Sequence, residues 1–126
     1  MTRPTLLVAE PEPSQALSVR KLVLETGKFN VLTAHSTREA LDIFDLFPNV
    51  SAAILVGEST IECDRAASVI KKATDKVPII YLHGSVGGRC SHADHDVSSH
   101  EPETLLALVR SLFGDPRQLD NADSRS

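Results

Sequence analysis

Aromatic residues and long apolar runs are both scarce in this chain of 126 residues. Aromatic residues make up 4% of the chain and tryptophan is missing, which argues against a stacking platform for nucleic-acid bases or sugars. The longest apolar runs, such as Ala52 to Val56, are far shorter than the roughly 20 residues that a membrane-spanning helix needs. We therefore expect neither a membrane anchor nor a signal peptide.

Cysteines are too few for a disulfide-rich secreted domain, and basic residues are too few for a typical nucleic-acid-binding domain. The two cysteines, Cys63 and Cys90, do not amount to the disulfide framework of a small secreted domain, which favours a reducing cytosol and a cytoplasmic location. Lys and Arg total 13 against 17 Asp and Glu, a formal charge of −4, and the basic residues are scattered. This charge pattern argues against nucleic-acid binding.

What the chain does contain is the composition of one ordinary globular domain, with 41% apolar and 24% charged residues. We expect a single domain over residues 1–114, followed by a polar tail or linker over residues 115–126. Such a tail suits a complete single-domain protein or a segment cut from a longer chain.

Short apolar runs alternate with helical patterns along the chain. The runs are too apolar to have one wet face, as is typical of strands buried in a parallel sheet. Strands are predicted at 5–9, 29–33, 52–56, 78–82 and, more weakly, 96–98. Helices are predicted from about 16 to Gly27, from Ser36 to before Pro48, over 63–73, and from Pro102 to Gly114. The second of these opens with the capping-box pattern of Ser36 and Glu39.

This alternation predicts an α/β fold of three layers, flavodoxin-like, with a five-stranded parallel sheet in the order 2-1-3-4-5. The working site of such a sheet lies beyond the carboxyl ends of its strands. Residues His83 to Asp94 hold three glycines and no helical stripe, so the helix after the fourth strand is reduced or absent. We expect this segment to be irregular and mobile, and to leave the sheet near Tyr81 and Val97 poorly covered.

Three segments resemble the receiver domain of bacterial response regulators, the CheY-like family. They are Leu6 to Pro13, Val77 to Leu82 and Pro102 to Leu106, and the resemblance spans about residues 5 to 114. It implies a module of two-component or phosphorelay signalling that acts through contact with a protein partner in its pathway. A homodimer is an open alternative.

The resemblance also implies where a phosphorylation site would lie. Receivers carry two acidic residues after the first strand, an aspartate nucleophile after the third, a Thr or Ser after the fourth and a Lys after the fifth. The corresponding positions here are Ala9 and Glu10, Val56 or Gly57, His83, and Ser98 or Ser99. One acidic side chain is all that remains of this set, and no Lys follows Lys76. The sequence therefore indicates a degenerate receiver, a pseudo-receiver, with no aspartyl phosphorylation and no enzymatic activity.

Two alternatives remain from the same strand ends. In one, the chain is a small ligand- or metal-binding module. Its pocket contains the acidic residues Glu10, Glu12 and Glu58 together with His83 and Ser85. In the other, Glu58 replaces the aspartate nucleophile, and the domain is an atypical phosphorylatable receiver. Glu58 lies one or two residues late for that role, which on a strand also reverses the direction of the side chain.

A group of metal-ligand residue types, Cys90, His92, His95 and His100, lies within the segment after the fourth strand. Their spacing matches no pattern that fixes a tetrahedral zinc site, so we expect solvated side chains and no metal. The glycines of Gly84 to Gly88 lack the Lys of a phosphate-binding loop. The strand-end loops lack the aromatic residues that would enclose a flavin ring. No cofactor is expected.

Overall fold

The computed structural model describes residues 4–10, 19–57, 61–83, 90–98 and 102–114. The strands in these ranges are β1 (Thr5–Ala9), β2 (Asn30–Ala34), β3 (Ala52–Val56), β4 (Ile79–His83) and β5 (His95–Ser98). The helices are α1 (Val19–Thr26), α2 (Thr37–Leu46), α3 (Cys63–Ala73) and α4 (Pro102–Phe113). No helix in the described residues is both long enough and apolar enough to span a membrane.

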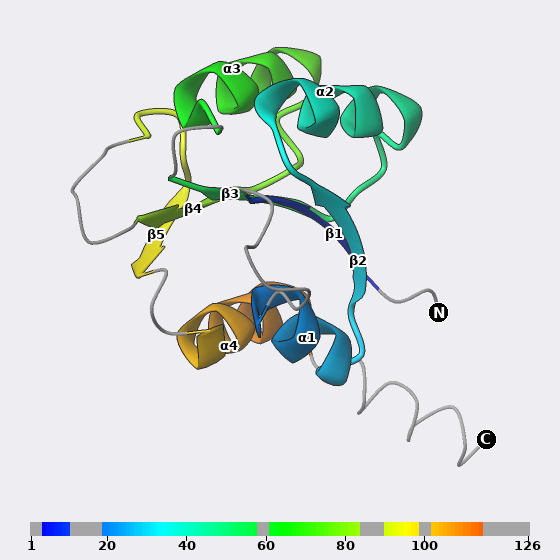
Figure 1. The fold of residues 1–126 in the computed structure, drawn as a ribbon, viewed down its shortest axis with the longest axis vertical. Helices are drawn as coiled ribbons and strands as arrows, with labels where there is room; N and C mark the ends of the chain where they lie inside the picture. The colour runs from blue at the N-terminus through cyan, green and yellow to red at the C-terminus, as the bar shows by residue number, and fades with distance from the viewer. Residues whose placement is uncertain (1–3, 11–18, 58–60, 84–89, 99–101, 115–126) are drawn as a thin grey trace.

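All neighbouring strands pair in parallel, in the order β2-β1-β3-β4-β5, which confirms the predicted sheet. Figure 1 shows the three layers: α2 and α3 cover one face of the sheet, and α1 and α4 cover the other. This arrangement brings the carboxyl ends of the strands to one edge of the sheet, where the candidate site is expected.

Burial on both faces explains why the strands β1, β3 and β4 are almost wholly apolar. Every residue of β3 is at most 1% exposed, and its side chains alternate between the two helical layers. Leu55 packs on the α2 and α3 side, whereas Ile54 and Val56 pack on the α1 and α4 side. The apolar runs thus reflect a central strand with no solvated face.

Local signals fix the ends of two helices. Ser36 caps α2 by accepting a hydrogen bond from the Glu39 N–H at 3.1 Å, as the capping-box pattern predicts. Gly27 follows α1 but serves close packing, since a Cβ atom there would lie 2.7 Å from Leu106 Cδ1 of α4. The left-handed backbone conformation falls instead on Lys28, with φ of 71°.

The step from β4 to β5 departs from the alternation. Within its described part, residues 90–94, the chain forms no helix, which agrees with the predicted loss of the fourth receiver helix. The expectation of a poorly covered sheet edge is wrong, however, because Tyr81 is 4% exposed and Val97 is 8% exposed. Other contacts must therefore fasten this segment to the domain.

Candidate functional site

The carboxyl end of β1 is closed by backbone hydrogen bonds. Ala9 is fully buried, and the following Glu10 is 2% exposed. The Glu10 N–H donates to the Ala34 carbonyl at 2.9 Å, and the Glu10 carbonyl accepts a hydrogen bond from His35 Nδ1 at 3.2 Å. The one retained acidic side chain thus lies inside the domain, and Glu12 lies outside the described residues.

The carboxyl end of β3 is occupied by an aromatic ring from the neighbouring strand. In the register of β3 and β4, Leu55 lies beside Tyr81, so Gly57 faces the same side of the sheet two residues further on. A Cβ atom on Gly57 would lie 2.6 Å from Tyr81 Cε1 and 2.8 Å from Tyr81 Cζ, and closer still to the Tyr81 hydroxyl. Val56 points to the opposite face and is 1% exposed in the α1 and α4 core.

Tyr81 sits in a dry, negatively charged environment. Burial raises the pKa of its hydroxyl above 10.0, and the carboxylates of Asp96 and Asp64 raise it further. The phenol therefore stays protonated throughout the neutral range. It fills the space beside Gly57 as a neutral group and offers no negative charge to a cation or a phosphoryl group.

At the end of β4, a histidine side chain contacts a carboxylate of β5. His83 Nδ1 pairs with Asp96 Oδ1 across the two strands. Ser98 ends β5 beside His83 in the register. Ser99, Ser85 and Glu58 lie outside the described residues. Of the three acidic residues in the pocket predicted from the sequence, Glu10 is the one that the structure describes. Strand β3 lies between Glu10, which follows β1, and His83, which ends β4.

The two cysteines form a disulfide with each other, a pairing that the sequence analysis did not predict. Cys63 begins α3, Cys90 follows β4, and their Cα atoms lie 5.7 Å apart, a usual separation for a disulfide. Sequence spacing could not show this pairing, because the fold brings together residues 27 positions apart.

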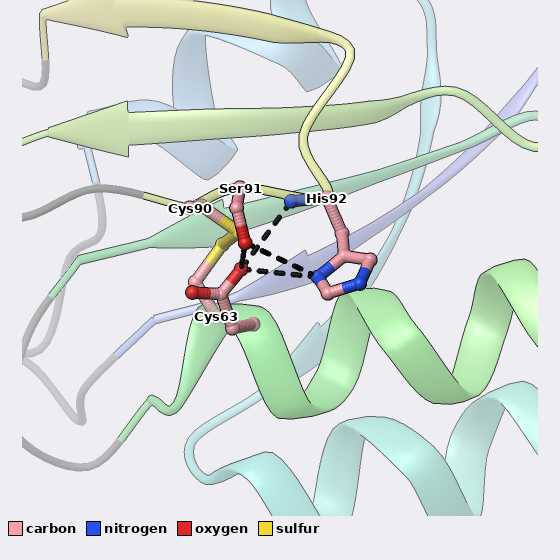
Figure 2. Close-up of polar contacts among 5 residues, drawn as sticks. Cys63, Cys90, Ser91 and His92 are labelled. Atoms are coloured by element: carbon pink, nitrogen blue, oxygen red, sulfur yellow. Dashed lines mark hydrogen bonds and ion pairs between the residues drawn. A yellow bond between two sulfur atoms is a disulfide. The ribbon is translucent and has the colours of Figure 1, made fainter.

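A cluster of polar contacts lies directly beside the disulfide (Figure 2). Asp64 Oδ1 accepts hydrogen bonds from Ser91 Oγ at 2.9 Å and from the His92 N–H at 3.3 Å, and pairs with His92 Nδ1 at 3.2 Å. The hydrogen bonds from Ser91 and then His92 lower the pKa of the Asp64 carboxyl. The arrangement is no hydrolytic triad, because Ser91 donates to the carboxylate and does not face the far nitrogen of the ring.

A second carboxylate fixes the start of β5. Asp94 Oδ2 accepts the Ile79 N–H at 2.7 Å and pairs with Lys71 Nζ of α3 at 2.7 Å. Partial burial alone would raise the pKa of the Asp94 carboxyl, but these hydrogen bonds and the Lys71 charge outweigh it and lower the pKa. The Asp94 N–H also donates to the Ile79 carbonyl at 2.8 Å, so this residue is held on both its backbone and its side chain.

The candidate metal ligands do not converge. Cys90 is bonded to Cys63, His92 faces Asp64, His95 lies in β5, and His100 is outside the described residues. Within the described ranges, no group of three or more His, Cys, Asp or Glu side chains could hold a metal ion.

The sequence analysis missed three residues of this edge: Cys63, Asp64 and Tyr81. The sequence holds one signal for this cluster. Each cysteine is followed by a polar residue, Asp64 after Cys63 and Ser91 after Cys90, and these two polar residues can form a hydrogen bond with each other. The predicted order places the third and fourth strands side by side, but the contact of Tyr81 with Gly57 also depends on the register of these strands.

A groove of about 410 Å³ lies at the opposite ends of the strands. Its walls include Asn30, Leu32 and Val50 together with the exposed side chains of Leu46 and Phe47. Thr5 and Asn30 begin their strands, so this hollow is remote from the carboxyl edge where the phosphorylation positions fall.

Solved structures of receiver domains share this architecture. A response regulator receiver domain protein from Clostridium thermocellum matches with a TM-score of 0.74 at 22% identity, over 92% of this chain and 98% of its own. A CheY-like receiver domain protein from Methanospirillum hungatei JF-1 matches with a TM-score of 0.73 at 16% identity, over 99% of this chain and 100% of its own.

The response regulator protein TrrA from Thermotoga maritima, solved in complex with Mg²⁺ and BeF, matches with a TM-score of 0.70. The two chains are 27% identical over 86% of this chain and 98% of TrrA. No family model and no curated protein matches the sequence. What the chain shares with these proteins is the fold of the response regulator receiver domain.

Proposed function

We propose that this protein is a receiver-like module of a bacterial two-component or phosphorelay system that signals through protein–protein contact, without aspartyl phosphorylation. Receiver domains are generally not enzymes, and this chain needs no catalytic step in the proposed role. The proposal places the module in residues 1–114, with residues 115–126 as a tail or linker, and locates it in the cytoplasm.

The observation that carries the proposal is the contact between Gly57 and Tyr81. A phosphoacceptor needs a carboxylate with open space in front of it for the incoming phosphoryl group. Gly57 has no side chain, and the Tyr81 ring lies within 3 Å of where its Cβ would be. Val56, the other alignment of the nucleophile, is buried in the opposite core. The geometry thus favours Gly57 as the position equivalent to the nucleophile.

The groups that would neutralise phosphoryl charge are missing as well. Magnesium prefers several oxygen ligands, and of the two receiver positions after β1, Ala9 carries no carboxylate and the Glu10 side chain is 2% exposed. His83, at the position of the receiver hydroxyl, is engaged by Asp96. Without such partners, a transferring phosphoryl group would lack the electrostatic stabilisation on which this chemistry depends.

The test is incubation of the full chain with acetyl phosphate and magnesium, followed by intact-mass measurement. We expect no phosphoryl adduct, whereas a receiver with a complete site, treated in parallel, gains one. A second arm adds magnesium and beryllofluoride, the ligand pair bound by TrrA. We expect no change in the NMR signals of residues 55–57 and 81–83.

A stable adduct that disappears in Glu58→Gln would overturn the proposal and establish the atypical phosphorylatable receiver. Tight magnesium binding without an adduct would instead favour the ligand-binding module. Capture of a signalling partner from the source organism by the unmodified chain would support the proposed role, provided that acetyl phosphate leaves the capture unchanged.

A further inference from the structure

A covalent bond ties residues 90–93, the described part of the connection between β4 and β5 before Asp94, to α3. Cys90 lies in this segment, and Cys63 is the first residue of α3. Figure 2 shows the disulfide reaching from the segment to the amino-terminal end of the helix. The bond therefore ties the β5 side of the carboxyl edge to the start of α3, the helix that follows β3 in the chain.

The polar contacts of residues 90–93 with α3 are weak, and beside them Ala93 packs in part against the core cluster that includes the buried face of α3. Ser91 and His92 bond to Asp64, and the His92 and Asp64 side chains are each 50% exposed. Exposed pairs of this kind contribute little, because water competes for both partners. The Ala93 N–H bonds back to the Cys90 carbonyl at 3.1 Å, which is a contact within the segment itself. The disulfide is thus the strongest tie between this segment and the helix.

The chain on the far side of Ala93 is anchored independently. Asp94 bonds to Ile79 through its backbone and its side chain, and it pairs with Lys71. Loss of the disulfide would consequently free residues 90–93 up to a fixed point at Asp94. In the reduced protein, we expect β4 and β5 to keep their register, because β5 begins directly after Asp94.

The cysteines suit a bond that opens and closes in the folded protein. Cys63 is 7% exposed and belongs to the core cluster between the sheet and helices α2 and α3. A reduced Cys63 remains a small apolar side chain and keeps this packing. Cys90 is less buried, so an external thiol can reach its sulfur first.

We propose that Cys63 and Cys90 form a reversible thiol–disulfide switch, in which reduction releases residues 90–93 from α3 while the sheet stays folded. A thiolate of a dithiol reductant attacks Cys90 Sγ, the bond between the two cysteines breaks, and Cys63 leaves as a thiolate that takes up a proton. The second thiol of the reductant then attacks the mixed disulfide and frees Cys90. A small disulfide such as glutathione disulfide reverses the two exchanges and is itself reduced to two thiols.

The switch gives the receiver scaffold a chemical input that needs no phosphoryl group. Disulfides in cytosolic proteins are commonly transient and redox-sensing, which agrees with the cytoplasmic module proposed above. That the switch replaces phosphorylation as the input rests on the proposed function. The thiol chemistry and the release of residues 90–93 rest on the contacts alone.

The experiment uses the full chain, purified without reductant and kept in native buffer. Iodoacetamide labelling followed by mass measurement should find no reactive thiol in the oxidised protein, both thiols after dithiothreitol, and none again after glutathione disulfide. Hydrogen exchange, followed by mass spectrometry, should be about tenfold faster or more across residues 90–93 in the reduced form. Exchange in β1 and β3 should stay the same within about twofold.

Two variants serve as matched controls. Cys63→Ala with Cys90→Ala should exchange like the reduced protein, with or without dithiothreitol. Asp64→Asn removes the neighbouring ion pair and leaves the cysteines intact, so its oxidised form should exchange residues 90–93 within about threefold of the wild type. Acetyl phosphate is added to both redox forms of the wild type. An adduct there would overturn the proposed function and leave the thiol result intact.

Four results would overturn the switch. The disulfide could resist dithiothreitol until denaturant is added, or its reduction could speed exchange equally in β1 and β3; each would make it a structural staple. Reduction could leave exchange of residues 90–93 unchanged. Reoxidation could join separate molecules instead of closing the bond within one chain.

Discussion

The centre of the sheet and its β5 edge are stabilised by different interactions. The strands β1 and β3 are buried between two helical layers and hold no ion pair among their described residues. The edge around β4 and β5 carries a disulfide, the ion pair of Lys71 with Asp94 and two histidine–carboxylate pairs. The described residues 90–94 beside β5 form no helix, and this part of the edge relies on specific links in addition to apolar burial.

This difference separates the scaffold from the features that respond to conditions. Burial of apolar surface changes little with pH or redox state, whereas ion pairs respond to pH and a disulfide responds to thiols. The centre should therefore account for most of the stability, and the edge should account for most of its dependence on the solvent.

The largest effect should come from truncating the centre. Ile54→Ala removes a fully buried side chain of β3 and leaves a cavity, which should lower the free energy of unfolding by about 2–5 kcal/mol. Urea denaturation of the oxidised protein measures this change. Val97→Ala in β5 is the matched edge variant and should cost less. An equal loss at the two positions would contradict the contrast between centre and edge.

Removal of the disulfide should come next. For a cross-link with a sequence separation of 27, the loss of the constraint on the unfolded chain predicts a decrease of about 3–4 kcal/mol in the free energy of unfolding. Urea denaturation with and without dithiothreitol gives the value. Cys63→Ala with Cys90→Ala should be insensitive to the reductant, and a decrease below about 1 kcal/mol would show that the cross-link adds little to the edge.

A smaller effect is expected where the centre meets the edge. Gly57→Ala places a methyl group within 3 Å of the Tyr81 ring and should cost about 1–3 kcal/mol through overpacking. Tyr81→Phe removes the hydroxyl but keeps the nearby ring carbons, so it should relieve part of this cost. A double-mutant cycle of the two substitutions measures the coupling, and strict additivity would refute the close contact.

The smallest effect should be the pH dependence of the edge. The pKa of the Asp94 carboxyl is lowered in the folded protein, so its contribution is present above the ordinary value of 3.8 and is lost as the pH falls through the lowered pKa. At neutral pH, Asp94→Asn should cost about 1 kcal/mol, since the side chain is 39% exposed. Denaturation at several pH values should show this difference shrinking below pH 3.8.

The fold was predictable because its signals are local or repeat along the chain. The apolar runs at 5–9 and 52–56 became central strands, and Ser36 caps α2 through Glu39 as its pattern required. The lack of a helix in the described residues 90–94 was predictable for the same reason, since glycines and a lack of apolar spacing show directly in the sequence.

The candidate site was less predictable because its contacts join residues that are distant in sequence. The pairing of Cys63 with Cys90 and the contact of Gly57 with Tyr81 depend on the positions of α3 and β4 in the finished fold. Counting cysteines led to a reducing cytosol and away from a cross-link. The resemblance to receivers predicts which residues are missing from the expected phosphorylation positions, but it does not predict the tyrosine that packs beside Gly57.

The disulfide also makes part of this protein a covalent ring. Helix α3 and strand β4 lie between Cys63 and Cys90 in the chain, so both belong to a closed loop of bonds. A single proteolytic cut anywhere inside that loop leaves one covalent molecule. The two fragments lose their covalent connection when the disulfide is reduced. Force applied at the two chain ends would bypass α3 and β4, and they would carry tension only after the bond had opened.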